Sequence, residues 1–569
     1  MQLGRARFGR DEVAGERGAV GAGNLRTAAA GARILAKGGN AVDAAIAAAF
    51  MAYVVEPASA GLGGHGRLTV HMSKLGKTIG IDHYIRAPGG ATPAAYTEAL
   101  RRSGHDTRRI KHTGHLSVGV FGTVAGICAA HERFATLPLP TLMEEAIGAA
   151  EVGPYIDREI QNAILGRVED LEGFPRAREA LLPGGRVPQV ANGLVRGTDG
   201  WEGPGHRLDT SDLARTLKRV AHEGAAAIYT GSIAEAIDRE MKANNGVLTA
   251  ADLAGYQPSV FDEALYTYRD HTYTTCSDLL GPQFLNIMER FDVAAMDPDG
   301  TDYRHLVAEA LALAFADTFH YPADPAAADA PRRGLAAKPY GQVQAARINM
   351  AKAMGRGGYG PGDPWPFEGR PRPAGTLAGG ETAPLPGTTA VTVGDSDGNI
   401  ASFITSLGSS FGSLVLVPDS GVFLGNAMQW FDPRPGLANS VAPGRMPVYG
   451  APLMTVYRQG VPVGATAGAG GFRIPTCLFH AFLNRVDHGM AIQAALDHPR
   501  LHTEGQELVV DERLGEPVIG ALMDRGHTVQ VNQDSYLSWS FGRPNAVWRD
   551  RGGTWHAASD AKSGGSAAV

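Results

Sequence analysis

Cysteine is scarce in this sequence. The 569-residue chain has only three, Cys128, Cys276 and Cys477, and they lie far apart. Their spacing excludes both the closely spaced set of a disulfide framework and the paired CxxC ligands of a structural zinc site. So few and so isolated thiols are typical of a protein from a reducing compartment.

The chain also has little excess charge and no long hydrophobic run. Its formal net charge is −6, so it lacks the basic footprint of a nucleic-acid-binding protein. The longest apolar stretch, residues 41–55, contains Asp43 and is too short to span a bilayer. Residues 1–18 are charged and lack the apolar core of a signal peptide. These absences predict a cytoplasmic protein with no nucleic-acid partner and no membrane partner.

Glycine and proline are abundant instead, with 75 and 35 residues. Residues 355–387 are rich in both and have no periodic apolar face, which indicates a long loop. Before this loop the apolar periodicity is mainly helical, with a few strands. It predicts two helices within 24–55, helical segments at 141–172, 211–241 and 303–319, and strands at 67–71 and 78–82.

The pattern changes to a period of two directly after the loop. Residues 388–393 and 399–406 alternate around a turn at 395–398, which predicts a β-hairpin. Further short strands are predicted at 414–417, 421–424, 454–457 and 461–466. The chain is therefore expected to consist of a helix-rich first part and a strand-rich second part that begins at Thr388.

Thr388 is the residue at this boundary that carries potential chemistry. A hydroxyl is a weak nucleophile at neutral pH and needs a base. If the bond between Gly387 and Thr388 breaks, Thr388 gains an α-amine with a pKa near ~8, which can serve as that base. The Thr388 hydroxyl can itself attack the Gly387 carbonyl, because glycine leaves room for the attack. By itself, the same pattern also describes a plain loop that enters a strand.

Matching segments in order along almost the whole chain resemble the γ-glutamyltranspeptidase family of N-terminal-nucleophile hydrolases. They are residues 29–57, 61–66, 116–126, 213–217, 248–256, 305–317, 558–560 and 563–565. The resemblance implies an α+β fold with four layers in the order αββα. It also implies a chain that cuts itself into a large fragment, 1–387, and a small fragment, 388–569. The two fragments form a heterodimer with one composite catalytic domain, and further oligomerisation stays open.

The resemblance also assigns catalytic roles to residues of this sequence. The nucleophile falls on Thr388 rather than Thr389, because the spacing to Gly398 agrees with the family pattern. Gly470 and Gly471 match the paired glycines whose backbone N–H groups stabilise the oxyanion. Ser406 stands where the family has a second threonine near the nucleophile. The alternative readings are a tight turn for the glycines and an ordinary strand residue for Ser406.

The family's γ-glutamyl clamp is not retained here. Where the family carries an Arg for the substrate carboxylate, this sequence has Tyr84. Where it carries Asn, Gln and Asp, this sequence has Gly408, Ala427 and Trp430, and its two-serine segment is replaced at 447–452. Each lost contact between a charged clamp residue and the substrate's carboxylate or ammonium group should cost several kcal/mol of binding free energy, because these contacts are desolvated. The catalytic groups are thus kept while the glutamyl pocket is not.

Other residues are candidates for contacting a different substrate. His65, Arg67 and Arg86 could meet an acidic group, although each could also be a structural or surface polar residue. Trp430 and Tyr449 could line a flatter, more apolar pocket or simply pack in the core. Arg473 is retained from the family motif and is a further candidate contact, although its role could be limited to bracing the glycine loop.

These observations favour a self-cleaving N-terminal-threonine hydrolase that acts on a small non-glutamyl acyl substrate, as an amidohydrolase or acylase. Three alternatives remain. One resembles C–C hydrolases that remove an oxalyl-type group in pathways to alkylproline antibiotics, another is an ordinary γ-glutamyltransferase or glutathione hydrolase, and the third is an uncleaved binding protein. Hydrolysis and acyl transfer are not distinguished.

No cofactor or metal is expected. Residues 21–26 faintly resemble a dinucleotide fingerprint, but an Arg replaces the third glycine and no strand precedes it. His112 and His115 lie close together in the sequence, but they lack a companion carboxylate cluster at metal-ligand spacing.

Overall fold

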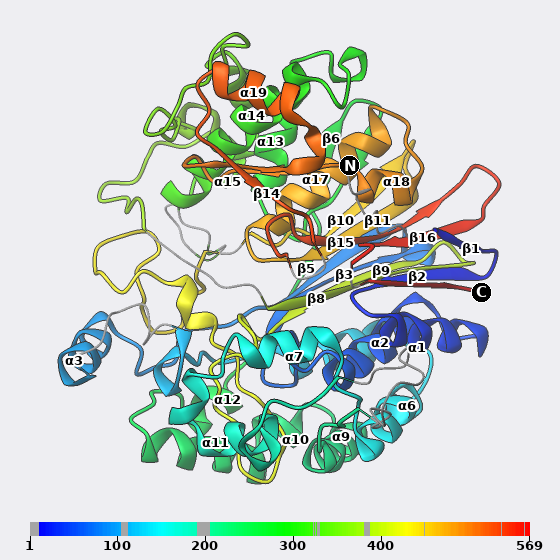
Figure 1. Ribbon diagram of the computed structural model, residues 1–569, viewed down its shortest axis with the longest axis vertical. Helices are drawn as coiled ribbons and strands as arrows, with labels where there is room; N and C mark the ends of the chain where they lie inside the picture. The colour runs from blue at the N-terminus through cyan, green and yellow to red at the C-terminus, as the bar shows by residue number, and fades with distance from the viewer. Residues whose placement is uncertain are drawn as a thin grey trace, which may run out of the picture.

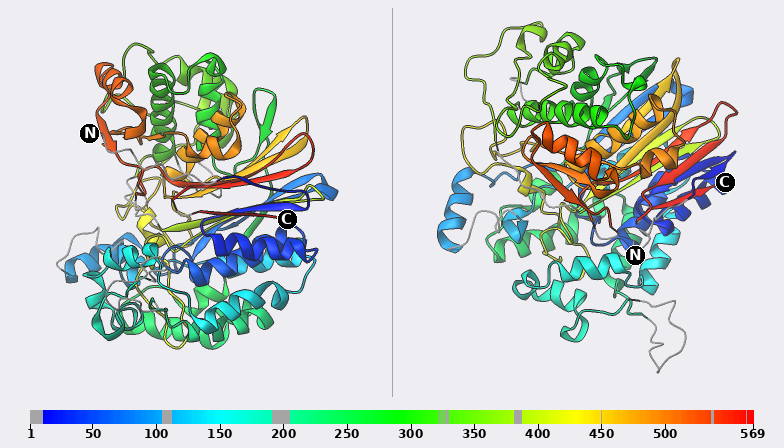
Figure 2. Two further views of the ribbon diagram at one scale, coloured as in Figure 1. Left: turned by 45° about the vertical axis from the view of Figure 1, so that its right-hand side comes forward. Right: turned by 45° about the horizontal axis from the view of Figure 1, so that its top comes forward.

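Two seven-stranded sheets stack face to face in the computed structural model, and helices cover both outer faces (Figure 1). The structure describes residues 11–103, 112–190, 205–321, 324, 326, 330–380, 387–448, 450–535, 538–562 and 564–569. Turned views show the same succession of helix, sheet, sheet and helix layers (Figure 2). The α+β fold with four layers is therefore confirmed.

The first sheet contains the hairpin that begins at Thr388, and all of its neighbouring strands are antiparallel. Its order is β17 (Gly565–Ala568), β2 (Gly18–Ala22), β8 (Thr388–Asp395), β9 (Ile400–Ser406), β3 (His65–Met72), β4 (Lys77–His83) and β5 (Ser259–Asp262). Every residue of β8 and β9 is buried, because the sheet is covered on both faces. The predicted hairpin is present.

The second sheet is also antiparallel throughout. Its order is β1 (Val13–Gly15), β16 (Trp555–Ser559), β15 (Arg543–Arg549), β11 (Val461–Ala469), β10 (Met454–Arg458), β7 (His271–Tyr273) and β6 (Tyr266–Tyr268). A small third sheet is formed by β12 (Leu501–His502), β13 (Leu508–Asp511) and β14 (Val529–Asn532). Both large sheets combine strands from before and after residue 388, so the two parts of the chain share one core.

Helices α1 (Leu25–Ala36) and α2 (Ala41–Val55) cover the outer face of the first sheet (Figure 1). The Asn24 side chain caps α1, and Asn40 caps α2 through a capping box with Asp43, as the sequence predicts for both asparagines. All residues of α2 are buried, which explains why its sequence is apolar nearly all round.

The remaining helices extend these two layers. On the side of α1 and α2 lie α3 (Pro93–Ser103), α5 (Thr123–Phe134), α6 (Leu139–Val152), α7 (Arg158–Leu165), α8 (Pro175–Leu181), α9 (Ser211–Glu223), α10 (Ala226–Tyr229), α11 (Gly231–Ala243) and α12 (Ala250–Ala254). On the far side lie α13 (Leu280–Met288), α14 (Thr301–His320), α15 (Arg332–Leu335), α16 (Lys338–Ala345), α17 (Arg473–Val486), α18 (Ile492–Asp497) and α19 (Glu516–Asp524). Within the described ranges, no helix combines the length and apolarity needed to cross a membrane.

Four predicted elements, two helical segments and two strands, differ from the structure because the backbone turns inside them. The helical segment 141–172 is interrupted at Gly153, which has a φ of +78°. The segment 211–241 breaks at Gly224, with a φ of +61°, and again before α11. The strands expected at 414–417 and 421–424 are reduced to isolated bridges, because Leu414 and Asp419 also adopt positive φ and curl the chain.

Candidate active site

Thr388 is the first residue of β8 and is joined to its neighbours by a directed chain of hydrogen bonds. Its Oγ1 donates to Ser406 Oγ at 3.0 Å, and Ser406 Oγ donates to the Gly387 carbonyl oxygen at 2.6 Å. The Gly408 backbone N–H donates to the same Ser406 oxygen at 2.8 Å. The β8–β9 register places Thr388 directly opposite Ser406. Ser406 therefore contacts both the Thr388 hydroxyl and the carbonyl oxygen of Gly387, which belongs to the peptide bond before Thr388.

Gly387 fits a position where no side chain can be accommodated. A Cβ at this position would lie 2.5 Å from the carbonyl carbon of Ser409 and 2.7 Å from its Cα. Both atoms belong to the backbone, so they could not move aside cheaply. The packing around the bond before Thr388 thus requires glycine.

Thr389 points to the opposite face of β8, because successive side chains of a strand alternate. Its Oγ1 donates to Glu56 Oε2 at 2.6 Å, and Thr27 Oγ1 donates to Glu56 Oε1 at 2.6 Å. The Thr389 hydroxyl is thus hydrogen-bonded to a partly buried carboxyl at the end of α2. This arrangement favours Thr388 over Thr389 as the nucleophile.

The Glu56 carboxyl has an unusual protonation equilibrium. Its pKa is raised to about 7, because burial, helped by the nearby charges of Glu159 and Asp157, outweighs the lowering effect of the hydrogen bonds from Thr27 and Thr389. Sequence analysis did not identify Glu56 as a functional candidate. The available signal was a lone charged residue that ends an otherwise apolar helix, directly before Pro57.

Replacing Glu56 with glutamine is expected to remove a pH dependence of stability. The pKa of Glu56 in the folded protein is above its ordinary value of 4.5. Its full stabilising contribution to folding is therefore present below pH 4.5 and is lost as the pH rises to about 7. The loss amounts to about 3 kcal/mol. Urea unfolding between pH 5 and 8 should show a steeper decline for the native protein than for Glu56→Gln. The exposed Glu144→Gln is the matched control, and equal slopes for native protein and Glu56→Gln would contradict the assignment.

Gly470 and Gly471 form the link between β11 and α17. They have φ angles of +131° and +62°, which favour glycine. Their backbone N–H groups lie just before the N-terminus of α17, where the helix dipole favours negative charge. Trp430 packs against this loop, since a Cβ on Gly471 would lie 3.7 Å from its ring, and it contacts Phe472 edge-on at 5.2 Å. These properties suit an oxyanion site with an aromatic wall.

His65 lies in the same row of the sheet as Thr388 and Ser406. It pairs in register with Ser406 from the adjacent strand β3, and its ring meets that of Tyr84 edge-on at 4.8 Å. Both rings are buried. Burial and, to a smaller extent, the nearby His83 together lower the pKa of His65 to about 3. His65 is therefore neutral at pH 7 and offers a hydrogen bond rather than a positive charge.

The three predicted arginines are all close to carboxylates of the protein. Arg67 is buried, with its Nε 3.4 Å from Asp82 Oδ2. Arg86 is partly exposed and lies 3.8 Å from Asp324 through Nη1, while Arg473 lies 3.8 Å from Glu504. Tyr449, the remaining predicted contact, lies outside the described residues. The structure thus joins Gly387, Thr388, Ser406 and His65 in one group but distributes the arginines among separate ion pairs.

Gly387 is one of the residues that line a small cavity of about 30 Å³. Arg543 and Glu159 form an ion pair in its wall, and the Arg543 guanidinium lies 3.7 Å from the centre of the Trp539 ring. This volume suits about one water molecule. Arg543 and Glu159 were not singled out from the sequence, and no local pattern could have paired residues so far apart in the chain.

A larger cavity, of about 710 Å³, lies beside the helices below the first sheet. Tyr53 and Leu407 are among its lining residues, together with residues 207–213. None of the described residues predicted to contact substrate lines this cavity.

Comparisons with known proteins give consistent similarities. A family model described as Gamma-glutamyltranspeptidase matches residues 27–569. The chain is 36% identical over 531 residues to the Acylase ACY 1 proenzyme of Pseudomonas sp. (strain SE83), covering 91% of this chain and 88% of the relative. It is 28% identical over 544 residues to the Glutathione hydrolase proenzyme of Bacillus subtilis (strain 168), covering 94% and 89%. The solved cephalosporin acylase from Bacillus halodurans matches with a TM-score of 0.85 at 26% identity, covering 100% of this chain and 99% of that one.

Proposed function

The chain belongs to the gamma-glutamyltranspeptidase family of N-terminal-nucleophile hydrolases, and we propose that it is an acylase precursor that activates itself by cutting between Gly387 and Thr388. The products are fragments 1–387 and 388–569, which remain associated because they share both sheets. The observation that carries this proposal is the hydrogen-bond chain from Thr388 Oγ1 through Ser406 Oγ to the Gly387 carbonyl oxygen. The word proenzyme in the names of both relatives supports it.

Maturation proceeds as an acyl shift followed by hydrolysis. The Thr388 oxygen attacks the Gly387 carbonyl carbon, while Ser406 donates a hydrogen bond to the carbonyl oxygen, where negative charge develops. The C–N bond breaks, the nitrogen takes up a proton, and an ester between Gly387 and the Thr388 oxygen forms. Water then hydrolyses this ester, which leaves a Gly387 carboxylate and a Thr388 that carries both a hydroxyl and a free α-amine.

The mature reaction uses the same oxygen on an external acyl group. The α-amine of Thr388 accepts the hydroxyl proton as Oγ1 attacks the substrate carbonyl, and it then protonates the leaving group. The backbone N–H groups of Gly470 and Gly471 stabilise the oxyanion, a contribution of about 3 kcal/mol per donor in other acyl-transfer sites. Water, activated by the same amine, then hydrolyses the ester on Thr388.

The substrate is a non-glutamyl acyl compound whose acyl group ends in a carboxylate or keto acid. Tyr84 and Trp430 are buried aromatic side chains that offer no charge to an amino-acid end. Thr388, Ser406 and His65 follow one another across three neighbouring strands, and Tyr84 directly follows the end of the next strand, β4, so strand spacing places Tyr84 about 14 Å from Thr388. Arg86, two residues beyond Tyr84, suits the distal end of an acyl group. Its ion pair with Asp324 is long and partly exposed, worth about 1 kcal/mol at most, and can exchange for a substrate carboxylate.

Mass spectrometry of the small fragment tests this proposal directly. Brief incubation with dicarboxylic acyl amides or oxalyl-type donors is expected to add the acyl mass to the peptide that begins at Thr388. Arg86→Ala should raise KM strongly and leave self-cleavage intact, because maturation uses the protein's own Gly387 carbonyl. The exposed Arg178→Ala serves as control. Adducts from neutral or amino-acid donors alone would refute the proposed substrate class, whereas an active, permanently uncut chain would refute the maturation.

A further inference from the structure

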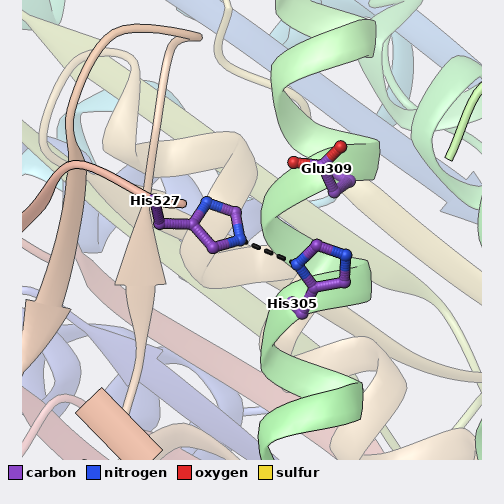
Figure 3. A group of neighbouring side chains, drawn as sticks. All are labelled: His305, Glu309 and His527. Atoms are coloured by element: carbon purple, nitrogen blue, oxygen red, sulfur yellow. Dashed lines mark hydrogen bonds between the residues drawn. The ribbon is translucent and has the colours of Figure 1, made fainter. Parts of the chain in front are cut away.

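Three potential metal ligands converge in the outer helical layer of the second sheet. His305 and Glu309 lie one turn apart on α14, and His527 lies between α19 and β14 (Figure 3). One ligand atom from each residue lies within 4.8 Å of the others. His305 and Glu309 are fully buried, and His527 is 8% exposed. The proposed reaction at Thr388 uses none of these side chains.

Hydrogen bonds to neighbouring groups orient each of the two ligands on α14. His305 Nε2 lies 3.0 Å from the Asn349 carbonyl oxygen, an acceptor that requires the N–H on this nitrogen. His305 Nδ1 is then left with a lone pair, and it faces His527 Nε2 at 2.8 Å. The Glu309 carboxylate accepts hydrogen bonds from the Tyr359 hydroxyl and, at 3.4 Å, from the Met354 backbone N–H. Support of this kind is typical of histidine and carboxylate ligands in metal sites.

We propose that His305, Glu309 and His527 bind one divalent transition-metal ion, of which zinc is the representative. Two imidazole nitrogens and one carboxylate are a donor set suited to zinc and to chemically similar ions. Zinc–nitrogen bonds of about 2.0–2.1 Å at a tetrahedral angle place two nitrogens about 3.3 Å apart. The histidine rings therefore need to separate by about half an ångström when the ion binds. Arg525 is close to the cluster, but its charge is offset by an ion pair with Asp302.

The position of the cluster in the chain gives the ion a specific role. His305 and Glu309 precede residue 387, whereas His527 follows it. If the proposed self-cleavage occurs, the ion links the large fragment to the small one by coordinate bonds. It would then stabilise the mature heterodimer without taking part in the reaction. This role rests on the proposed function, whereas metal binding itself does not.

Metal binding can be measured on both the native protein and the Thr388→Ala precursor. After treatment with a chelator and dialysis, each is titrated with Co²⁺ and with Zn²⁺. We expect one equivalent per chain, a visible Co²⁺ absorption band that Zn²⁺ abolishes, and a rise in melting temperature of several degrees. His527→Ala should weaken binding at least ~100-fold, whereas the exposed His222→Ala should not change it.

A second variant keeps the experiment decisive even if His527→Ala does not fold properly. Glu309→Gln keeps the size of the side chain and an acceptor for Tyr359 but removes the charge, so it should weaken binding at least ~10-fold. The proposed site would be overturned if the native protein bound the metal no more tightly than His527→Ala. It would also be overturned if both His527→Ala and Glu309→Gln bound the metal with native affinity. In the mature protein, zinc should raise the urea concentration at which the fragments separate. Metal binding by both proteins without this shift would overturn only the linking role.

Discussion

Thr388→Ala is expected to leave the 59.7 kDa chain as a single band on a denaturing gel, while the native protein gives two. Without the hydroxyl, nothing attacks the Gly387 carbonyl, and Ser406 loses the donor that contacts it at 3.0 Å. Activity should fall at least ~10³-fold, because the same oxygen is the proposed nucleophile of the mature enzyme. N-terminal sequencing of the small native fragment should begin Thr-Thr-Ala-Val.

Three matched variants separate the role of this hydroxyl from a general effect on folding. Thr388→Ser keeps the oxygen and should still be cut. Thr389→Ala removes only the contact with Glu56 and should also be cut, with lower stability. Ser406→Ala keeps the nucleophile but loses the hydrogen bond to the Gly387 carbonyl, so it should mature ~10²-fold more slowly. Cleavage of Thr388→Ala at the native position would show that another group performs the attack.

The second large effect is expected in substrate choice. A glutaryl anilide and a γ-glutamyl anilide have the same carbon chain and terminal carboxylate, and only the second carries an ammonium group. We expect kcat/KM to be at least ~100-fold higher for the glutaryl compound. The sequence resemblance implies that Trp430 replaces the family's aspartate for that ammonium, and the buried Trp430 ring packs on Phe472. A buried charge left without a partner costs several kcal/mol, which corresponds to a factor of 100 or more.

Measuring both anilides with one preparation removes differences in maturation from the comparison, and Thr388→Ala gives the background rate. Equal rates for the two compounds would show that the ammonium is tolerated. Faster turnover of the γ-glutamyl compound would instead support an ordinary glutathione hydrolase, which is one of the alternatives left open by the sequence. Turnover of neither would leave oxalyl-type donors as the substrates to be tested on the same fragment.

The sequence by itself determined those features whose causes are local. The asparagines that cap α1 and α2, the apolar circumference of α2 and the alternating hairpin from Thr388 each depend on residues a few positions apart. The α+β class followed from the resemblance, and the position of Thr388 after Gly387 was visible as a change of period. Helix breaks were harder to locate, because Gly153 and Gly224 break their helices through a positive φ that a glycine permits but does not require.

Only the tertiary structure decided which partners the polar side chains have. Thr389 meets Glu56, Arg543 meets Glu159, and His305 meets His527, each across more than two hundred residues of chain. The local sequence around either partner contains no trace of the other, because these contacts arise when sheets and helical layers pack. The same packing makes His65 neutral and pairs Arg67 with Asp82, although both side chains looked available for an acidic ligand. Burial and long-range proximity, rather than residue type, set the charge that each group can offer.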